Sequence, residues 1–149
     1  MKPLLSNKQV LREYGLVDKY EAGIKLLGLE AKALREGRGN LRGSLVKIIE
    51  EKVLLVGFNL PPYSKSSDNH YNSTRSRRLL LNKREINKLA GFLSQKGLEA
   101  FPLKVYTKNN LIKLEIGVGR RLKKYEKKEV VKEKQERRDL DRSLRDKLD

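Results

Sequence analysis

Residues 98–118 read LEAFPLKVY-TKNN-LIKLEIGV, two apolar segments separated by four polar residues. Leu98 to Tyr106 and Leu111 to Val118 are rich in the β-branched, aromatic and aliphatic residues that favour strands. The segment Thr107-Lys108-Asn109-Asn110 between them supplies asparagines, which tolerate turn conformations. The stretch therefore predicts an antiparallel hairpin, in a body made mostly of strands that hairpins connect.

The preceding residues predict further strands with short helices between them. Strands are expected over 16–27, with a kink or bulge at Gly23, and over 45–60, as a hairpin that turns at residues 50–52. Helices are expected over 8–14 with Asn7 as the cap, over 29–36 ending at Gly37, and after Asn82, with which the capping-box pattern starts. Residues 61–74 predict a loop. The fold class is mainly β with short helices (α+β), arranged as a small antiparallel barrel.

Charge separates the chain into two parts. The formal net charge is +16, and residues 1–119 hold 22 basic and 11 acidic residues. Residues 120–149 hold 13 basic and 8 acidic residues without Gly or Pro. We therefore predict a barrel over 1–119 and a basic tail over 120–149. Positive charge on both parts favours an extended polyanion as partner, with nucleic acid the first interpretation and an anionic membrane the weaker one.

The tail has too few apolar residues to fold by itself, but it consists almost wholly of good helix formers. We expect it to be disordered when free and helical when bound to a partner. Leu140, Leu144 and Leu148 would form a thin apolar stripe on such a helix. Tyr125 lies among lysines, an arrangement suited to stacking on an unpaired base. A solvated charged helix or plain disorder is the alternative.

Little in the sequence predicts catalysis, a metal site or secretion. The single histidine, His70, lies in the polar loop, and the absence of cysteine excludes disulfides and thiolate ligands. Residues 37–43 (GRGNLRG) only superficially resemble a dinucleotide-binding fingerprint, because the last spacing is one residue too long and the segment follows a predicted helix. No apolar run is long enough to cross a membrane, and we expect a cytoplasmic protein with no cofactor.

Two arginine clusters are candidate phosphate contacts. Arg35, Arg38 and Arg42 lie among three glycines, where the backbone could approach a phosphate closely. Arg75 and Arg77 would share one face of a strand that continues into Leu79 to Leu81. For the first cluster an ordinary turn with solvated arginines stays open as an alternative, and for the second a solvated strand edge.

Ordered motifs along most of the chain resemble the small protein B family, the SsrA-binding proteins of bacterial trans-translation. The resemblance covers residues 7–128. The motifs that carry it are YEAGI at 20–24, GLEAKALREG at 28–37 with Asn40, Leu41 and Ser44, RSRRLLL at 75–81, Glu85-Ile86, Pro102-Leu103 and Tyr106.

The resemblance implies an OB-like antiparallel barrel with about three peripheral helices. It also implies binding to the tRNA-like domain of tmRNA, and delivery of alanyl-tmRNA with elongation factor Tu to stalled ribosomes. The tail would enter the decoding site and mRNA path of the small subunit, without chemistry by the protein itself. A ribosomal protein or a general structured-RNA binder with the same barrel is the alternative.

The resemblance and the basic clusters together give the candidate site residues. The predicted tmRNA-binding residues are Asn7, Glu21, Gly23, Lys32, Arg35, Arg38, Arg75, Arg77, Leu80 and Lys113. The predicted decoding-site residues of the tail are Lys123, Lys124, Tyr125, Glu126, Lys127 and Lys128. Two departures from the family lie here: its Asp-Lys-Arg motif is Glu126-Lys127-Lys128, and its Gly-Lys-Lys, with a flexible hinge glycine, is Arg121-Leu122-Lys123.

Overall fold

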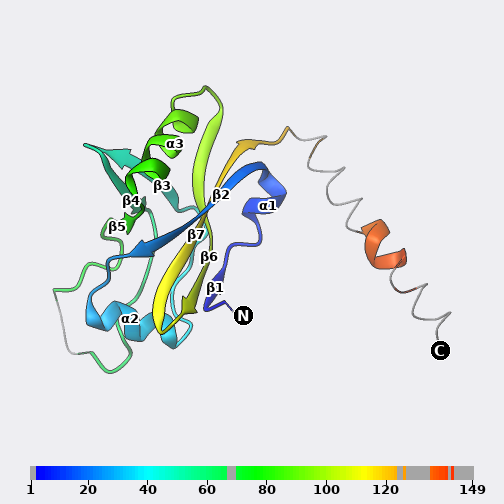
Figure 1. Cartoon of the computed structure of the whole chain (residues 1–149). Helices are drawn as coiled ribbons and strands as arrows, with labels where there is room; N and C mark the ends of the chain where they lie inside the picture. The colour runs from blue at the N-terminus through cyan, green and yellow to red at the C-terminus, as the bar shows by residue number, and fades with distance from the viewer. Residues whose placement is uncertain (1–2, 67–69, 124–125, 127–134, 141, 143–149) are drawn as a thin grey trace.

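The computed structural model describes residues 3–66, 70–123, 126, 135–140 and 142. Its body is an antiparallel sheet of seven strands with three short helices around it (Figure 1). The fold class predicted from the sequence, mainly β with about three peripheral helices, is confirmed.

The hairpin predicted for residues 98–118 forms two neighbouring strands of 11 residues each. β6 spans Leu98–Lys108 and β7 spans Leu111–Arg121, with Lys108 paired to Leu111. The turn residues Asn109 and Asn110 both have positive φ, 51° and 64°. A two-residue turn with two left-handed residues matches the twist of the strands it joins, and asparagine adopts this conformation more easily than most residues. Both strands are longer than predicted, and β7 continues two residues past the expected boundary at 119.

β2, Tyr14–Ile24, pairs along most of its length with β7. The register of this pair shifts between Leu16 and Asp18, so the irregularity of the strand lies there. The prediction of a kink or bulge at Gly23 is wrong, because Gly23 keeps regular pairing with β7 and also pairs with β5. A glycine inside a strand often marks a bulge, but here it leaves a position without a side chain on a regular strand.

The remaining strands close the sheet into a ring. They are β1 Leu5–Ser6, β3 Leu45–Ile49, β4 Lys52–Val56 and β5 Arg77–Leu80. β3 and β4 form the predicted hairpin, with positive φ at Glu50 and Glu51. The strand order is β1-β6-β3-β4-β5-β2-β7, and β6 also pairs with β7, which closes the barrel. Inward side chains of these strands, together with Leu34, Phe58 and Leu89, make up the main buried core.

The three helices confirm two of the predicted caps and correct the third. α2, Gly28–Arg35, ends before Gly37, whose φ is 78°. α3, Lys83–Leu93, has the capping box between Asn82 and Glu85. α1, Val10–Glu13, is capped at Gln9 without a side-chain bond. The prediction that Asn7 caps it is wrong: its side chain is buried and donates from Nδ2 to the carbonyl oxygen of Pro102, 2.9 Å away.

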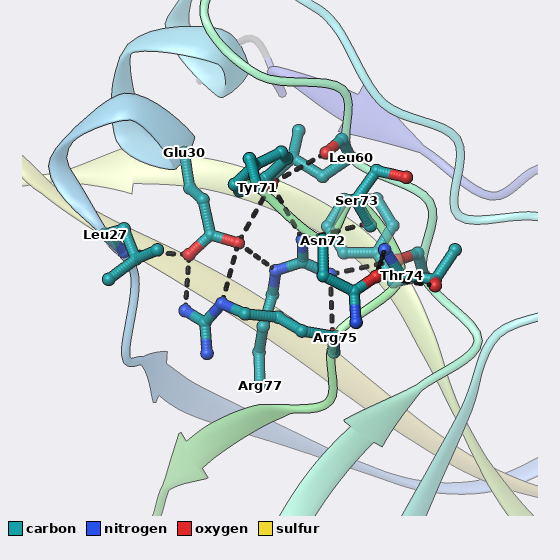
Figure 2. A network of polar contacts seen from close by, with 10 residues as sticks. Leu27, Glu30, Leu60, Tyr71, Asn72, Ser73, Thr74, Arg75 and Arg77 are labelled. Carbon is teal, nitrogen blue, oxygen red and sulfur yellow. Dashed lines mark hydrogen bonds and ion pairs between the residues drawn. The ribbon is translucent and has the colours of Figure 1, made fainter. Parts of the chain in front are cut away.

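A buried carboxylate joins α2 to the segment leading into β5. Glu30 is 0% exposed and accepts hydrogen bonds from Arg75 and from Arg77 Nε, the latter at 2.6 Å (Figure 2). Arg77 is also 0% exposed, and its Nη1 donates to the carbonyl oxygens of Phe58 and Arg75. Tyr71 donates to Glu30 Oε2 at 3.1 Å. The loop before β5 is therefore tied to α2 by fully hydrogen-bonded charges rather than by apolar packing.

The arginines keep Glu30 ionised despite its position. Burial by itself would raise the pKa of the Glu30 carboxyl, but hydrogen bonds from Arg75, the Leu27 backbone N–H and Arg77 outweigh it and hold the pKa below its usual range. Removing one partner of a buried pair leaves the other charge uncompensated, which is costly.

We expect Glu30→Gln to lower the free energy of unfolding at pH 7 by about 3–5 kcal/mol, since Arg77 would then be buried without a countercharge. Urea denaturation of the two proteins measures this. The matched control is Lys88→Gln, which breaks the exposed Lys88–Asp18 pair (3.3 Å) and should cost less than about 1 kcal/mol. Equal losses in the two variants would contradict the structural importance of the buried pair.

The effect of Glu30→Gln on the free energy of unfolding should depend on pH. Because the folded-state pKa of Glu30 is lowered, its stabilising contribution is complete above the unfolded-state value of about 4.3 and is lost as the pH falls through the folded-state pKa. The difference in free energy of unfolding between wild type and Glu30→Gln should therefore shrink on acidification below about pH 4. A difference that stayed constant down to pH 2.5 would be the contrary result.

Candidate RNA-binding surface

Three strands bring predicted site residues together on the outside of the barrel. Gly23 of β2 pairs with Leu80 of β5 on one side and with Lys113 of β7 on the other. Paired residues of antiparallel strands point to the same face of the sheet, so Leu80 and Lys113 flank a position that has no side chain. Leu80 is 44% exposed. We call this face, with Glu21, Tyr106 and Lys108 next to it, the β2 surface.

Glu21 is held in place by groups from β6. The Tyr106 hydroxyl donates to Glu21 Oε2, and Lys108 Nζ lies 3.3 Å from Oε1. The hydrogen bond from Tyr106, followed by Lys108 and Lys113, keeps the pKa of the Glu21 carboxyl below its usual range. Glu21 is therefore an exposed, oriented carboxylate near Lys108 and Lys113, and it pairs across the strands with a second acidic residue, Glu115 of β7.

Tyr106 is buried, and its hydroxyl orients the Glu21 carboxylate. Burial, and then the bond to Glu21, raises the pKa of the Tyr106 hydroxyl, so it stays protonated and acts as a donor. Lys104 Nζ lies 5.5 Å from the centre of its ring. Sequence analysis did not assign Tyr106 or Lys108 to the site. Tyr106 belonged to a matching motif, but nothing in the sequence showed that β6 lies next to Glu21 through β7.

The first arginine cluster lies near the tip of the β6–β7 hairpin. Arg35 Nη2 donates to the carbonyl oxygen of Asn110 over 3.4 Å, which places the end of α2 against the turn. Lys32, one turn earlier, lies with Nζ 5.4 Å from the centre of the Tyr63 ring. Arg38 is exposed just beyond the helix. These three cations and the hairpin tip give a basic region at the end of the barrel where α2 lies (Figure 1).

The second cluster has a different role. Arg75 is partly exposed, 31% for its side chain, and Arg77 is completely buried; both pair with Glu30 (Figure 2). Arg77 therefore offers no surface to an RNA, which corrects its assignment as a contact residue. Alternation predicted that both arginines share one face of a strand, but β5 begins at Arg77, so Arg75 lies in the loop before it, and only the Arg77 side chain is fully buried. Glu30 was the residue that sequence analysis missed, since only the fold brings it to the two arginines.

Asn7 lies apart from the β2 surface. Its backbone N–H donates to Leu103 and its side chain to Pro102, so it is anchored to β6 near α1. It borders a cleft of about 320 Å³ that is also lined by Arg42, Tyr14 and Arg121. The candidate residues thus occupy separate places on the barrel: Glu21, Gly23, Leu80 and Lys113 form one cluster, and Lys32, Arg35 and Arg38 form the basic region near the hairpin tip.

Only part of the tail prediction falls on described residues. Lys123 is exposed, and Glu126 accepts from Arg120 Nη2 at 2.8 Å and from the Lys123 backbone N–H at 3.2 Å. Residues 135–140 are helical and exposed. Lys124, Tyr125, Lys127 and Lys128 lie outside the described residues, as do Leu144 and Leu148.

The described residues form neither a cluster of metal ligands nor a membrane-spanning helix. No group of three or more metal-binding side chains occurs among the residues that the structure describes. Within those same ranges, no helix is both long and apolar enough to span a membrane. His70 is exposed in the loop. The chemistry that remains is that of guanidinium and ammonium groups for phosphates, with one oriented carboxylate for a hydrogen-bond donor.

Comparison with known proteins gives one consistent result. Residues 4–146 match the family model described as SmpB protein. An SsrA-binding protein of Geobacillus thermodenitrificans is 39% identical over 97% of this chain and 94% of its own. One from Sulfurihydrogenibium is 42% identical over 99% of this chain and 97% of its own. A solved structure described as "tmRNA-SmpB: a journey to the center of the bacterial ribosome" has a TM-score of 0.67 and 36% identity, covering 83% of this chain and 87% of that one.

The match to the family model covers residues 4–146, nearly the whole chain. The motifs from YEAGI to Tyr106 lie mainly on the strands that form the β2 surface and on the helix α2. This chain therefore belongs to the SmpB protein family.

Proposed function

We propose that this protein binds the tRNA-like domain of tmRNA and acts in trans-translation, delivering alanyl-tmRNA with elongation factor Tu to stalled ribosomes in the cytoplasm. The observation that carries the proposal is the β2 surface, where Glu21, Gly23, Leu80 and Lys113 meet although they come from three separate strands. The names of its relatives, SsrA-binding proteins, support the same partner.

The β2 surface provides different contacts for different parts of an RNA. Lys113 and Lys108 can neutralise phosphates, a contribution that does not depend on sequence. The Glu21 carboxylate cannot bind a phosphate, because both are anions. It can accept hydrogen bonds from base amino groups, as carboxylates do from cytosine. The side chain of Leu80 next to Gly23 can pack against a base or sugar. We therefore assign Glu21 and Leu80 to recognition and the lysines to affinity.

The basic region around α2 extends this surface. Arg35, Arg38 and Lys32 lie at the barrel end that includes the hairpin tip, where a folded RNA could contact them together with Lys108. Arg75 would contribute through its partly exposed guanidinium, and Asn7 through the separate region near α1. Binding needs no catalytic group of the protein, and we propose that it catalyses no reaction itself.

The proposal assigns the tail a separate task. The barrel would hold tmRNA, and the C-terminal segment, including residues 123–128, would contact the decoding site and mRNA path of the small ribosomal subunit. Its 13 basic residues suit ribosomal RNA, and its helix-forming composition suits folding on that surface.

Glu21→Gln should weaken binding to the tRNA-like domain about tenfold and change binding to an unrelated structured RNA of equal length by less than twofold. The reason is that a carboxylate in a charge-assisted hydrogen bond is worth about 1.5–3 kcal/mol, whereas its removal hardly alters counterion release. Fluorescence anisotropy with both RNAs at one moderate salt concentration measures this. Glu136→Gln, an exposed tail position, is the control with the same change in charge. A uniform effect on both RNAs, or equal wild-type affinity for both, would argue for a general RNA binder.

Removal of residues 124–149 should leave affinity for the tRNA-like domain within about twofold and abolish peptide tagging on stalled ribosomes. This truncation keeps β7 intact, because the strand ends at Arg121. A reconstituted tagging assay with full-length and truncated protein side by side provides the measurement. Tagging by the truncated protein would contradict the division of tasks, whereas lost affinity would show that the tail belongs to the tmRNA-binding part.

A further inference from the structure

The last residues of β7 are fixed to the barrel by backbone pairing. Arg121 pairs with Tyr14 and Arg120 with Gly15, and the Leu122 N–H donates to the Glu13 carbonyl oxygen at 2.7 Å. The strand therefore holds its direction to the point where the C-terminal segment begins. Figure 1 shows this end of β7 next to α1 and β2.

The backbones here approach so closely that side chains are excluded. A Cβ on Gly119 would lie 2.5 Å from the Gly15 carbonyl oxygen, which no real Cβ tolerates. A Cβ on Gly15 would lie 3.3 Å from Leu122 Cδ2, so the Leu122 side chain covers that glycine. Two glycines thus let the end of β7 lie flat against β2.

Side chains from three strands then lock Arg121. Its Nη2 donates to the Tyr14 hydroxyl at 3.0 Å, and the guanidinium lies 5.3 Å from the centre of the Tyr14 ring. The Tyr14 hydroxyl in turn donates to Glu99 Oε2 at 2.6 Å. The ring is buried and lies 4.6 Å from that of Phe101. The hydroxyl therefore accepts from β7 and donates to β6 at the same time.

This double role requires a protonated tyrosine. Burial and the hydrogen bond to Glu99 raise the pKa of Tyr14, although Arg121 opposes the shift. The Tyr14 hydroxyl therefore keeps its proton at neutral pH and remains a donor to Glu99.

A second contact connects the end of β7 to Glu126, beyond the strand. Arg120 makes two hydrogen bonds to Glu126, Nη2 to Oε2 at 2.8 Å and Nη1 to Oε1 at 3.4 Å. Glu126 Oε1 also accepts from the Lys123 N–H at 3.2 Å. The hydrogen bonds from Arg120, and then from the Lys123 backbone, lower the pKa of Glu126, so this carboxylate is ionised at neutral pH. A bidentate arginine–carboxylate pair fixes orientation as well as distance.

We propose that these two contacts form a latch, Arg121 on Tyr14 and Glu99 together with Arg120 on Glu126, which fixes the direction in which the C-terminal segment leaves the barrel. Arg120, Arg121, Tyr14 and Glu126 are positioning residues in this scheme. The latch rests on the proposed function, in which the C-terminal segment acts on the ribosome.

The benefit of a latch is that orientation is set before binding. A segment that already points in one direction loses less conformational freedom when it enters a narrow channel than one that samples many directions. Loss of the latch should therefore affect the step on the ribosome and not the grip on tmRNA.

The direct test measures the order of the junction in the free, full-length protein. The chain has no cysteine, so Lys19→Cys and Lys123→Cys introduce the only two spin-label sites, both at exposed positions. Pulsed electron paramagnetic resonance then reports the distribution of the distance between them. We expect a narrow distribution for the parent and a clearly broader one for Tyr14→Phe, Arg121→Met and Arg120→Glu. The exchanged pair Arg120→Glu with Glu126→Arg should restore a narrow distribution.

The control is Tyr20→Phe, which removes a hydroxyl from another buried tyrosine of β2 and should leave the width unchanged. A broad parent distribution, or equal widths in parent, Tyr14→Phe and Arg121→Met, would overturn the latch. Failure of the exchanged pair to narrow the distribution would remove Arg120 and Glu126 from it.

The functional arm uses the same variants in the tagging assay. Tyr14→Phe and Arg121→Met should keep affinity for the tRNA-like domain within about twofold and lose about five- to tenfold in tagging rate at limiting protein. Broad distributions with unchanged tagging would overturn the aiming role. Failure of the proposed function would give a different result, namely tagging by the protein without residues 124–149 while the parent distribution stays narrow.

Discussion

The structure depends on the buried carboxylate of Glu30, which lies between the guanidinium groups of Arg75 and Arg77. Glu30 belongs to α2, and its ion pairs and hydrogen bonds connect this helix to the loop before β5 and to β5 itself. Charges in such a place stabilise only when their hydrogen-bonding groups are satisfied, and here the Leu27 N–H, the Tyr71 hydroxyl and two arginines donate to the Glu30 carboxylate. Because β5 carries Leu80 on its outer side, the buried pair also determines where one edge of the β2 surface lies.

The protein separates its charges by burial. Arg77 is buried and pairs with Glu30 inside the protein. Lys108 and Lys113 instead lie at or near the surface. Glu21 prevents this surface from being uniformly cationic. An acidic group that is held by a tyrosine and a lysine adds selectivity to an area that would otherwise attract any polyanion. A tyrosine also orients a charged side chain where β7 ends. There Tyr14 binds Arg121, and the contact orders the end of the strand.

Local sequence patterns predicted most of the elements because local physics determines them. The Asn109-Asn110 turn, the Asn82 capping box and the glycine after α2 were all found in this way. The failures concern long-range partners: Asn7 bonds to Pro102 instead of capping α1, and Arg77 faces a carboxylate 47 residues away in the chain. Alternation predicted a strand face shared by Arg75 and Arg77, but it could not show that β5 begins at Arg77 or that the Arg77 side chain is buried. The site was predicted mainly through the family resemblance, and Tyr106 entered it only once the strand order was known.

Closure of the barrel also limits when the protein can fold during its own synthesis. β2 finds its main partner in β7, near the other end of the chain, and β6 can complete its pairing only when β7 is present. Contacts between such distant segments form late and slowly, after most of the chain entropy has been lost. While β7 is still inside the exit tunnel, the nascent chain has an open sheet with unpaired edges on β2 and β6. The barrel is therefore completed only after β7 has left the exit tunnel.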